Sequence, residues 1–116
     1  MARVVFVIVD ALAHRHVNAT TTPTMHALGL EGGSALGRAV MTSATYPNHA
    51  TFATGALPLD HGVVANWIVS EGRARPSYDI GPATPTIFDA CHAGGRSCVA
   101  VLGDQHLVSI MGATRA

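Results

Sequence analysis

The six residues V-V-F-V-I-V at positions 4–9 constrain the fold more than any other stretch of the sequence. The run is apolar throughout, and every side chain in it except Phe6 is β-branched. A strand without apolar–polar alternation is typical of a parallel sheet that is covered on both faces. Residues 35–41 and 97–102 predict two further strands, and residues 67–69 predict a short one.

Helix signals lie between these runs, with a proline near the start of most segments and a glycine after the end. They predict helices at residues 23–31, 47–54, 85–93 and 104–111. Residues 71–85, which hold three prolines and most of the exposed charge, predict a loop. The alternation of strands and helices predicts an α/β fold with a mainly parallel sheet flanked by helices.

The amino-acid composition indicates which kinds of partner to expect for this chain. Hydrophobic residues make up 48% of the sequence and charged residues only 12%, whereas about 25% is usual for a soluble domain. So little charge implies that much of the surface is covered, and the expected partner is the rest of a longer parent chain or an oligomer. The net charge is zero and no basic run is present, so no nucleic-acid polymer is expected.

The sequence also bears on location. No apolar run approaches the roughly 18 residues needed to cross a membrane, so no membrane partner is expected. The N-terminus imitates a signal peptide, but the apolar run is short and Asp10 interrupts it. The expected location is therefore cytoplasmic, with export as the alternative. Cys91 and Cys98 are too few for a disulfide framework and are expected to be buried and reduced.

Polar residues follow two of the predicted strands. Asp10 ends the run at residues 4–9, and Thr45 follows the run at residues 35–41. Function in open α/β sheets lies beyond the carboxyl ends of the strands, so both residues are expected at one edge of the sheet. A carboxylate after an apolar strand is costly unless it is paired or bound to a cation. The alternative for Asp10 is a helix cap or a turn residue.

Thr45 and Asn66 each have a structural and a chemical interpretation. A Thr before Pro at a helix start is usually a cap. The same position would let the Thr45 hydroxyl face an anion bound at the helix N-terminus, and a nearby cation would make that hydroxyl a nucleophile. Asn66, which follows H-G-V-V-A, is either a turn residue or a donor of its amide N–H to a phosphoryl oxygen.

Three segments in order resemble a known family. The segments are V-V-F-V-I-V-D-A-L at residues 4–12, T-P-T-M-H-A-L-G-L-E-G-G at 22–33, and T-Y-P-N-H-A-T-F-A-T-G-A-L-P-L-D-H-G-V-V-A-N at 45–66. Together they resemble the alkaline phosphatase superfamily, and the third segment resembles its nucleotide pyrophosphatase/phosphodiesterase branch. The resemblance covers residues 4–66 well and is less specific from Thr86 to Leu102.

This resemblance implies a hydrolase of phosphodiester, pyrophosphate or phosphomonoester bonds that acts on a small phosphorylated substrate. Its site would hold two divalent metal ions, expected to be zinc. Asp10 matches a metal ligand. Thr45 matches the nucleophile, which also contacts the metals and becomes transiently phosphorylated. Asn66 matches the residue that contacts a phosphate oxygen. A phosphonate hydrolase of the same superfamily and a non-catalytic α/β module that binds a phosphorylated ligand are the alternatives.

The chain departs from the family in its metal ligands. The family's remaining ligands, a D-x-x-x-H motif, an aspartate–histidine pair and a final His, come later than any match here. Residues 1–116 are therefore interpreted as the N-terminal part of a single, incomplete alkaline-phosphatase-like catalytic domain, expected to be inactive alone. His14 and His61 imitate ligand motifs and are expected to be structural. His49 is expected to pack or hydrogen-bond at the helix start, and His106 is a weaker candidate for substrate contact.

Overall fold

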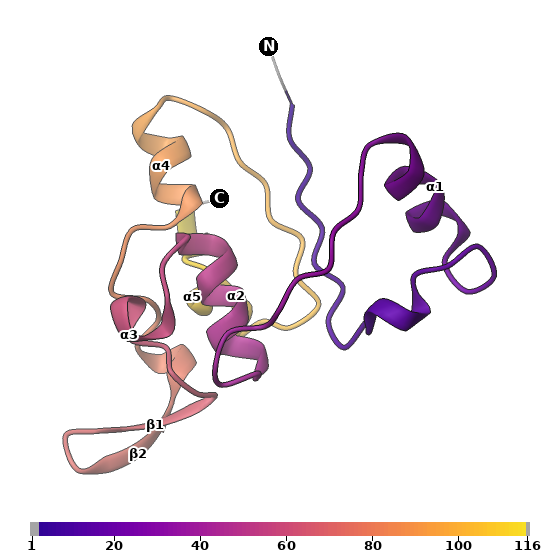
Figure 1. Ribbon diagram of the computed structural model, residues 1–116. Coiled ribbons are helices and arrows are strands. Elements are labelled where there is room, and N and C mark those ends of the chain that lie inside the picture. The colour runs from indigo at the N-terminus through magenta and orange to yellow at the C-terminus, as the bar shows by residue number, and fades with distance from the viewer. Residues whose placement is uncertain (1–2, 116) are drawn as a thin grey trace. The chain divides into compact units, whose positions relative to one another are not determined.

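The computed structural model describes residues 3–115, and the chain in it divides into two compact units (Figure 1). The first unit spans Met1–Arg38 and the second spans Ala39–Ala116. Met1, Ala2 and Ala116, which belong to the predicted domain, lie outside the described residues. Between residues 3 and 115, no helix is long and apolar enough to cross a membrane.

The first unit contains the 3₁₀ helix η1 (His14–His16) and the helix α1 (Pro23–Glu31). Proline stands at the first position of α1 and Gly32 follows its end, so the predicted bounds are confirmed. Thr22 does not cap α1 with its side chain. Its hydroxyl instead donates to the carbonyl of His16 at 3.0 Å and accepts the N–H of Asn18 at 3.2 Å, which closes the turn before the helix.

The strand predicted at residues 4–9 is absent from the first unit, so that prediction is wrong for the described residues. The run has no strand assignment, and its side chains are largely exposed, with Val4 at 88%. A strand forms only where a neighbouring segment accepts and donates its backbone hydrogen bonds. No strand that could pair with this run is assigned within residues 3–38.

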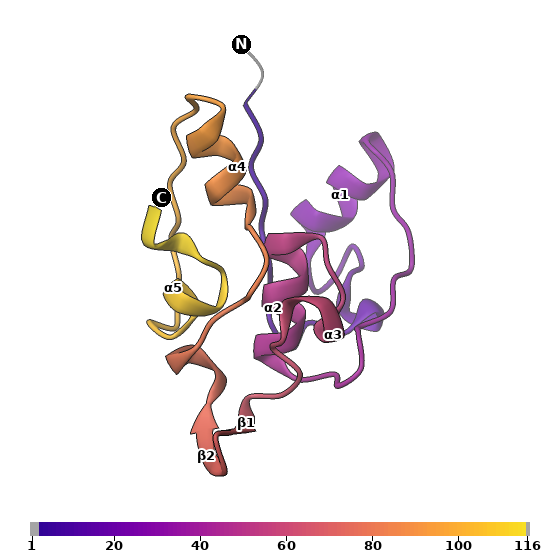
Figure 2. The same ribbon diagram turned by 90° about the vertical axis from the view of Figure 1, so that its left-hand side faces the viewer.

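Short helices form the body of the second unit (Figures 1 and 2). They are α2 (Thr45–Thr54), α3 (Pro58–His61), α4 (Ile87–Ala93) and α5 (Leu107–Ile110). α2 contacts the other three helices. The core between them consists of Ala50, Val63, Leu107 and Ile110. A last 3₁₀ helix, η3 (Ala113–Arg115), packs on α4 and α5.

Two of these helices have clear terminal signals in the sequence. α2 begins at Thr45, two residues earlier than predicted, and ends as predicted before Gly55, which has the left-handed φ of 70°. α4 begins after Thr86, whose hydroxyl accepts the N–H of Asp89 while the Asp89 carboxylate accepts the N–H of Thr86. This reciprocal pair is a capping box, which fixes the start of α4. α5 is shorter than the helix predicted at residues 104–111.

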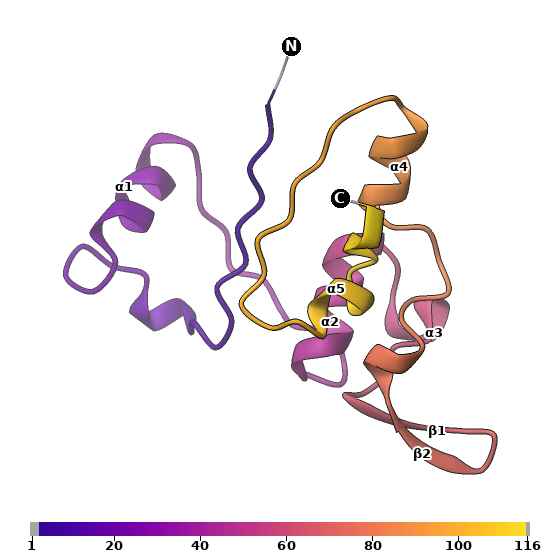
Figure 3. The same cartoon turned by 180° about the vertical axis from the view of Figure 1, so that it is seen from behind.

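The strand predicted at residues 67–69 is confirmed, but it belongs to a hairpin. β1 (Trp67–Ser70) pairs antiparallel with β2 (Arg73–Pro76), and Figure 3 shows the hairpin extending away from the helices of its unit. Its two-residue turn is Glu71-Gly72, with φ of 54° and 73°. Positive φ at both positions matches the tight turns that strand twist favours. The loop predicted at residues 71–85 is therefore wrong in its first part, which holds β2 and η2 (Ser77–Asp79).

The strands predicted at residues 35–41 and 97–102 are also absent from the described residues. In the second run Val99 is 87% exposed and Val101 is 94% exposed. The described chain is thus a mixed α/β structure, as predicted at the level of class. The mainly parallel sheet is not shown, because the one sheet within residues 3–115 is the antiparallel hairpin.

Candidate active site

Thr45 occupies the first position of α2 and is half-buried. The residue before it is extended, so the chain turns into the helix at this point. Neither the hydroxyl nor the backbone N–H of Thr45 has a hydrogen-bond partner among the described residues. Pro47, two positions later, has no N–H to offer. The first turn of α2 therefore presents the Thr45 hydroxyl and N–H together at the positive end of the helix.

Asn66 is brought directly to this helix start. Its Oδ1 accepts the backbone N–H of Tyr46 at 3.0 Å, so it caps α2 from the loop before β1. A backbone N–H can only donate, and this fixes the orientation of the Asn66 amide. The Nδ2 group, its donor end, has no acceptor among the described residues. The structure thus brings together Thr45 and Asn66, two of the predicted site residues.

The segment that leads into Thr45 is held by Asn48. The Oδ1 of Asn48 accepts the N–H of Val40 at 3.0 Å, and its Nδ2 donates to the carbonyl of Ala44 at 2.8 Å. A second tie comes from Thr42, whose hydroxyl donates to the carbonyl of Val64 at 2.8 Å. These side chains connect the approach to Thr45 with α2 and with the loop that carries Asn66.

Two histidines of the second unit have structural contacts. His49 is buried, and its Nδ1 donates to the carbonyl of Thr45 at 2.8 Å, as expected for a histidine that hydrogen-bonds at the helix start. His61 is fully buried; its Nδ1 accepts the N–H of Val63 at 3.1 Å and its Nε2 donates to the Thr51 hydroxyl at 3.0 Å. Burial lowers the pKa of His61, and both ring nitrogens are occupied.

A group of aromatic and acidic side chains adjoins the candidate nucleophile, and sequence reasoning missed most of it. The Tyr46 hydroxyl donates to the Asp104 carboxylate at 3.2 Å, and burial and this carboxylate raise the pKa of Tyr46. The Tyr78 ring meets Tyr46 edge-on at 6.0 Å and stacks on His106 at 3.8 Å. The position of Tyr46 directly after Thr45 was the one signal that could have indicated this cluster.

Asp10 lies in the first unit, in the turn that follows residues 4–9, and its side chain is exposed. His14 is exposed in η1 of the same unit. No group of three or more His, Cys, Asp or Glu side chains able to hold a metal ion occurs within residues 3–115. A zinc ion usually takes four donors, so the described residues do not by themselves fit a two-metal centre.

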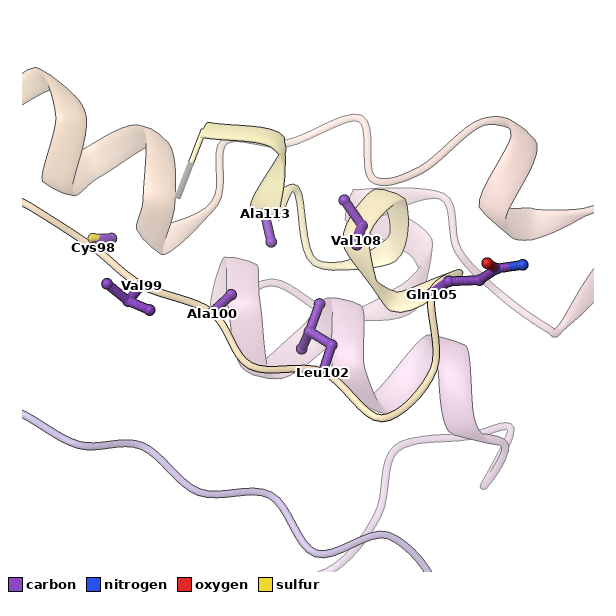
Figure 4. A pocket seen from close by; sticks show the side chains of 7 residues that line it. All are labelled: Cys98, Val99, Ala100, Leu102, Gln105, Val108 and Ala113. Atoms are coloured by element: carbon purple, nitrogen blue, oxygen red, sulfur yellow. The ribbon is translucent and has the colours of Figure 1, made fainter.

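An open cavity of about 420 Å³ lies elsewhere in the second unit. Figure 4 shows the side chains that line it, which are Cys98, Val99, Ala100, Leu102, Gln105, Val108 and Ala113. Most of these residues have apolar side chains, and none of them is a predicted site residue. Cys91 and Cys98 are free and half-buried, less buried than expected, and the hydrogen bond between their thiols raises the pKa of Cys98.

Comparison with known families decides where the chain belongs. The family model for type I phosphodiesterase / nucleotide pyrophosphatase matches residues 4–105. The chain is a member of this family. Comparison with curated proteins gave no match, and comparison with solved structures gave none either. Membership indicates hydrolase chemistry of the phosphodiesterase and nucleotide pyrophosphatase type, and the match includes the helix start with Thr45 and the loop with Asn66.

Proposed function

We propose that this chain carries the nucleophile and a phosphate-binding residue of an enzyme that hydrolyses phosphodiester or pyrophosphate bonds in a small phosphorylated substrate. One observation carries the proposal. The unpartnered Thr45 hydroxyl stands at the N-terminus of α2 beside Asn66, whose oxygen is occupied by the Tyr46 N–H. The arrangement offers an attacking oxygen and an amide donor within one short stretch of surface, in a chain of the appropriate family.

The proposed chemistry uses two displacements. The Thr45 oxygen attacks phosphorus and gives its proton to solvent water. The bond from phosphorus to the leaving oxygen breaks, that oxygen departs with the electron pair and takes a proton from solvent, and a phospho-threonine forms. Water then attacks this phosphorus, which releases the phosphate product and restores the hydroxyl. Asn66 Nδ2 donates to a phosphoryl oxygen as negative charge grows on it, and the N-terminus of α2 favours the same charge.

Two divalent cations, zinc in the family resemblance, belong to the proposal, with Asp10 and Thr45 as ligands. Such ions neutralise charge on the transferred group when they are bound. The described residues would supply one carboxylate and one hydroxyl to such a centre, fewer than the four donors that a zinc ion usually takes. We also propose that residues 1–116 are the N-terminal part of an alkaline-phosphatase-like domain, in which the runs at 4–9 and 97–102 find strand neighbours.

The test uses the full-length protein with zinc, p-nitrophenyl phosphodiesters and monoesters, and a phosphonate as a third substrate. Thr45→Ala should lower kcat by a factor of about 1,000 or more, because alanine has no oxygen that can attack phosphorus. Thr54→Ala, at the other end of α2, is the matched control and should retain activity. Mass spectrometry of the acid-quenched wild-type enzyme should find phosphate on Thr45.

Three outcomes would change the proposal. Full activity in Thr45→Ala would exclude this residue as the nucleophile. Hydrolysis of the phosphonate alone would assign the chain to the phosphonate hydrolases of the superfamily. Binding of a phosphorylated ligand by wild-type protein without any turnover would make the chain a binding module.

A further inference from the structure

Three consecutive backbone carbonyls in the loop before β1 are each held by a hydrogen bond from outside the loop. The Thr42 hydroxyl donates to the carbonyl of Val64, the Ser77 hydroxyl donates to that of Ala65, and the Ser77 N–H donates to that of Asn66 at 2.9 Å. Two of these three bonds come from Ser77. This serine begins η2, directly after the hairpin, and its side chain is only 1% exposed.

The two bonds from Ser77 fix the backbone at Asn66 and at the residue before it. The direction of the Asn66 side chain depends on this backbone, because Oδ1 must reach the N–H of Tyr46 at 3.0 Å. A free loop would let the Asn66 amide sample other directions, and the donor end would lose its fixed relation to Thr45. A misplacement of about 1 Å in a reacting geometry is enough to lower a rate by about 100-fold.

We propose that Ser77 is a positioning residue for Asn66: it anchors the loop so that the amide of Asn66 stays against the helix start that carries Thr45. The catalytic consequence rests on the proposed function, while the anchoring itself does not. Ser77 touches neither Thr45 nor a substrate in this scheme and acts through Asn66 alone. A purely structural role, in which Ser77 only closes the base of the hairpin, is the competing account.

A double-mutant cycle in the full-length protein separates the two accounts. Ser77→Ala should lower kcat for a p-nitrophenyl phosphodiester by about 10- to 100-fold. In an Asn66→Ala background the same substitution should lower kcat by less than about twofold, because the residue through which Ser77 acts is already gone. Equal losses in both backgrounds would overturn the proposal.

Thr86→Ala is the matched control, because Thr86 is also a buried hydroxyl with local hydrogen bonds but lies at the start of α4. Thr86→Ala should lower the free energy of unfolding. It should leave kcat within about twofold of the parent protein, both in the wild-type and in the Asn66→Ala background. If Ser77→Ala does not fold, Thr42→Val replaces it in the cycle, since Thr42 is exposed and holds the same loop at Val64. If Thr42→Val lowered kcat by the same factor in the wild-type and Asn66→Ala backgrounds, the proposal that the loop positions Asn66 would be overturned.

Amide hydrogen exchange tests the anchoring without any activity. Ser77→Ala should accelerate exchange of the Tyr46 N–H by about 10-fold or more relative to wild type, because that N–H is protected by Asn66. The N–H of Ala90, bonded to Thr86 within the α4 start, should keep its wild-type rate. An inactive wild-type enzyme would overturn the proposed function alone. An unchanged Tyr46 rate would overturn the role of Ser77, whatever the activity.

Discussion

At the scale of the residue, His61 shows how burial turns an apparent metal ligand into a structural side chain. It is fully buried, neutral and bonded at both ring nitrogens, and burial lowers its pKa below the ordinary 6.5. The unfolded chain therefore binds a proton at His61 at higher pH than the folded chain does. As pH falls below about 6.5, folding stability should fall, by up to about 1.4 kcal/mol per pH unit for this one group.

Denaturant unfolding between pH 8 and pH 5 measures this effect. His61→Gln should lower stability at pH 8 by about 1–3 kcal/mol through lost buried hydrogen bonds, and should remove the part of the acid slope that belongs to His61. His92→Gln is the control, since His92 is exposed on α4 and its replacement leaves the buried contacts of His61 in place. An acid slope that is equal in wild type and His61→Gln would contradict a lowered pKa.

The sequence predicted part of the candidate site at this scale. The family resemblance assigned Thr45 and Asn66 to one phosphate site, and the bond from the Tyr46 N–H to Asn66 brings the two residues together. Their chemical roles stay predictions, as does the role of Asp10. Ser77 was missed because its contacts with the loop before β1 depend on the hairpin returning the chain to that loop, and no local pattern encodes such a return.

At the scale of the element, helices were predictable and buried strands were not. The bounds of α1 and the end of α2 follow from proline and glycine because a helix satisfies its hydrogen bonds within a few residues. A strand depends on a neighbour that can be far away in sequence. The runs at 4–9 and 97–102 have strand-like composition and no strand neighbour among the described residues, whereas β1 forms because its partner β2 follows after a two-residue turn.

The start of α4 offers a prediction for one element. Thr86→Ala removes one half of the capping box, the hydroxyl that accepts the N–H of Asp89. The free energy of unfolding should fall by about 1–2 kcal/mol. Thermal or urea unfolding measures the change. Thr86→Ser keeps the hydroxyl, and its free energy of unfolding should fall by less than half as much as that of Thr86→Ala. Equal losses for the two substitutions would attribute the effect to the buried methyl group instead of the cap.

At the scale of the whole molecule, low charge and exposed apolar side chains favour association of the chain with itself or with a partner. Only 12% of the residues are charged, and Val99 and Val101 are almost fully exposed. A monomer rarely exposes contiguous apolar surface without a partner that covers it. The 116-residue chain, studied alone, should therefore bind a hydrophobic dye and associate with itself as its concentration rises.

Replacing Val99 and Val101 together by Thr should reduce dye fluorescence and shift sedimentation toward the monomer, because Thr keeps the branched shape and adds a polar group. Since both positions are exposed, the free energy of unfolding of the double variant should stay within about 0.5 kcal/mol of the wild-type value. Val63→Thr is the contrasting variant. Val63 lies in the core at 1% exposure, so the same change should destabilise the second unit by about 1–3 kcal/mol without reducing association. Unchanged dye binding in the double variant, or a stability loss like that of Val63→Thr, would mean that residues 97–102 are covered in solution.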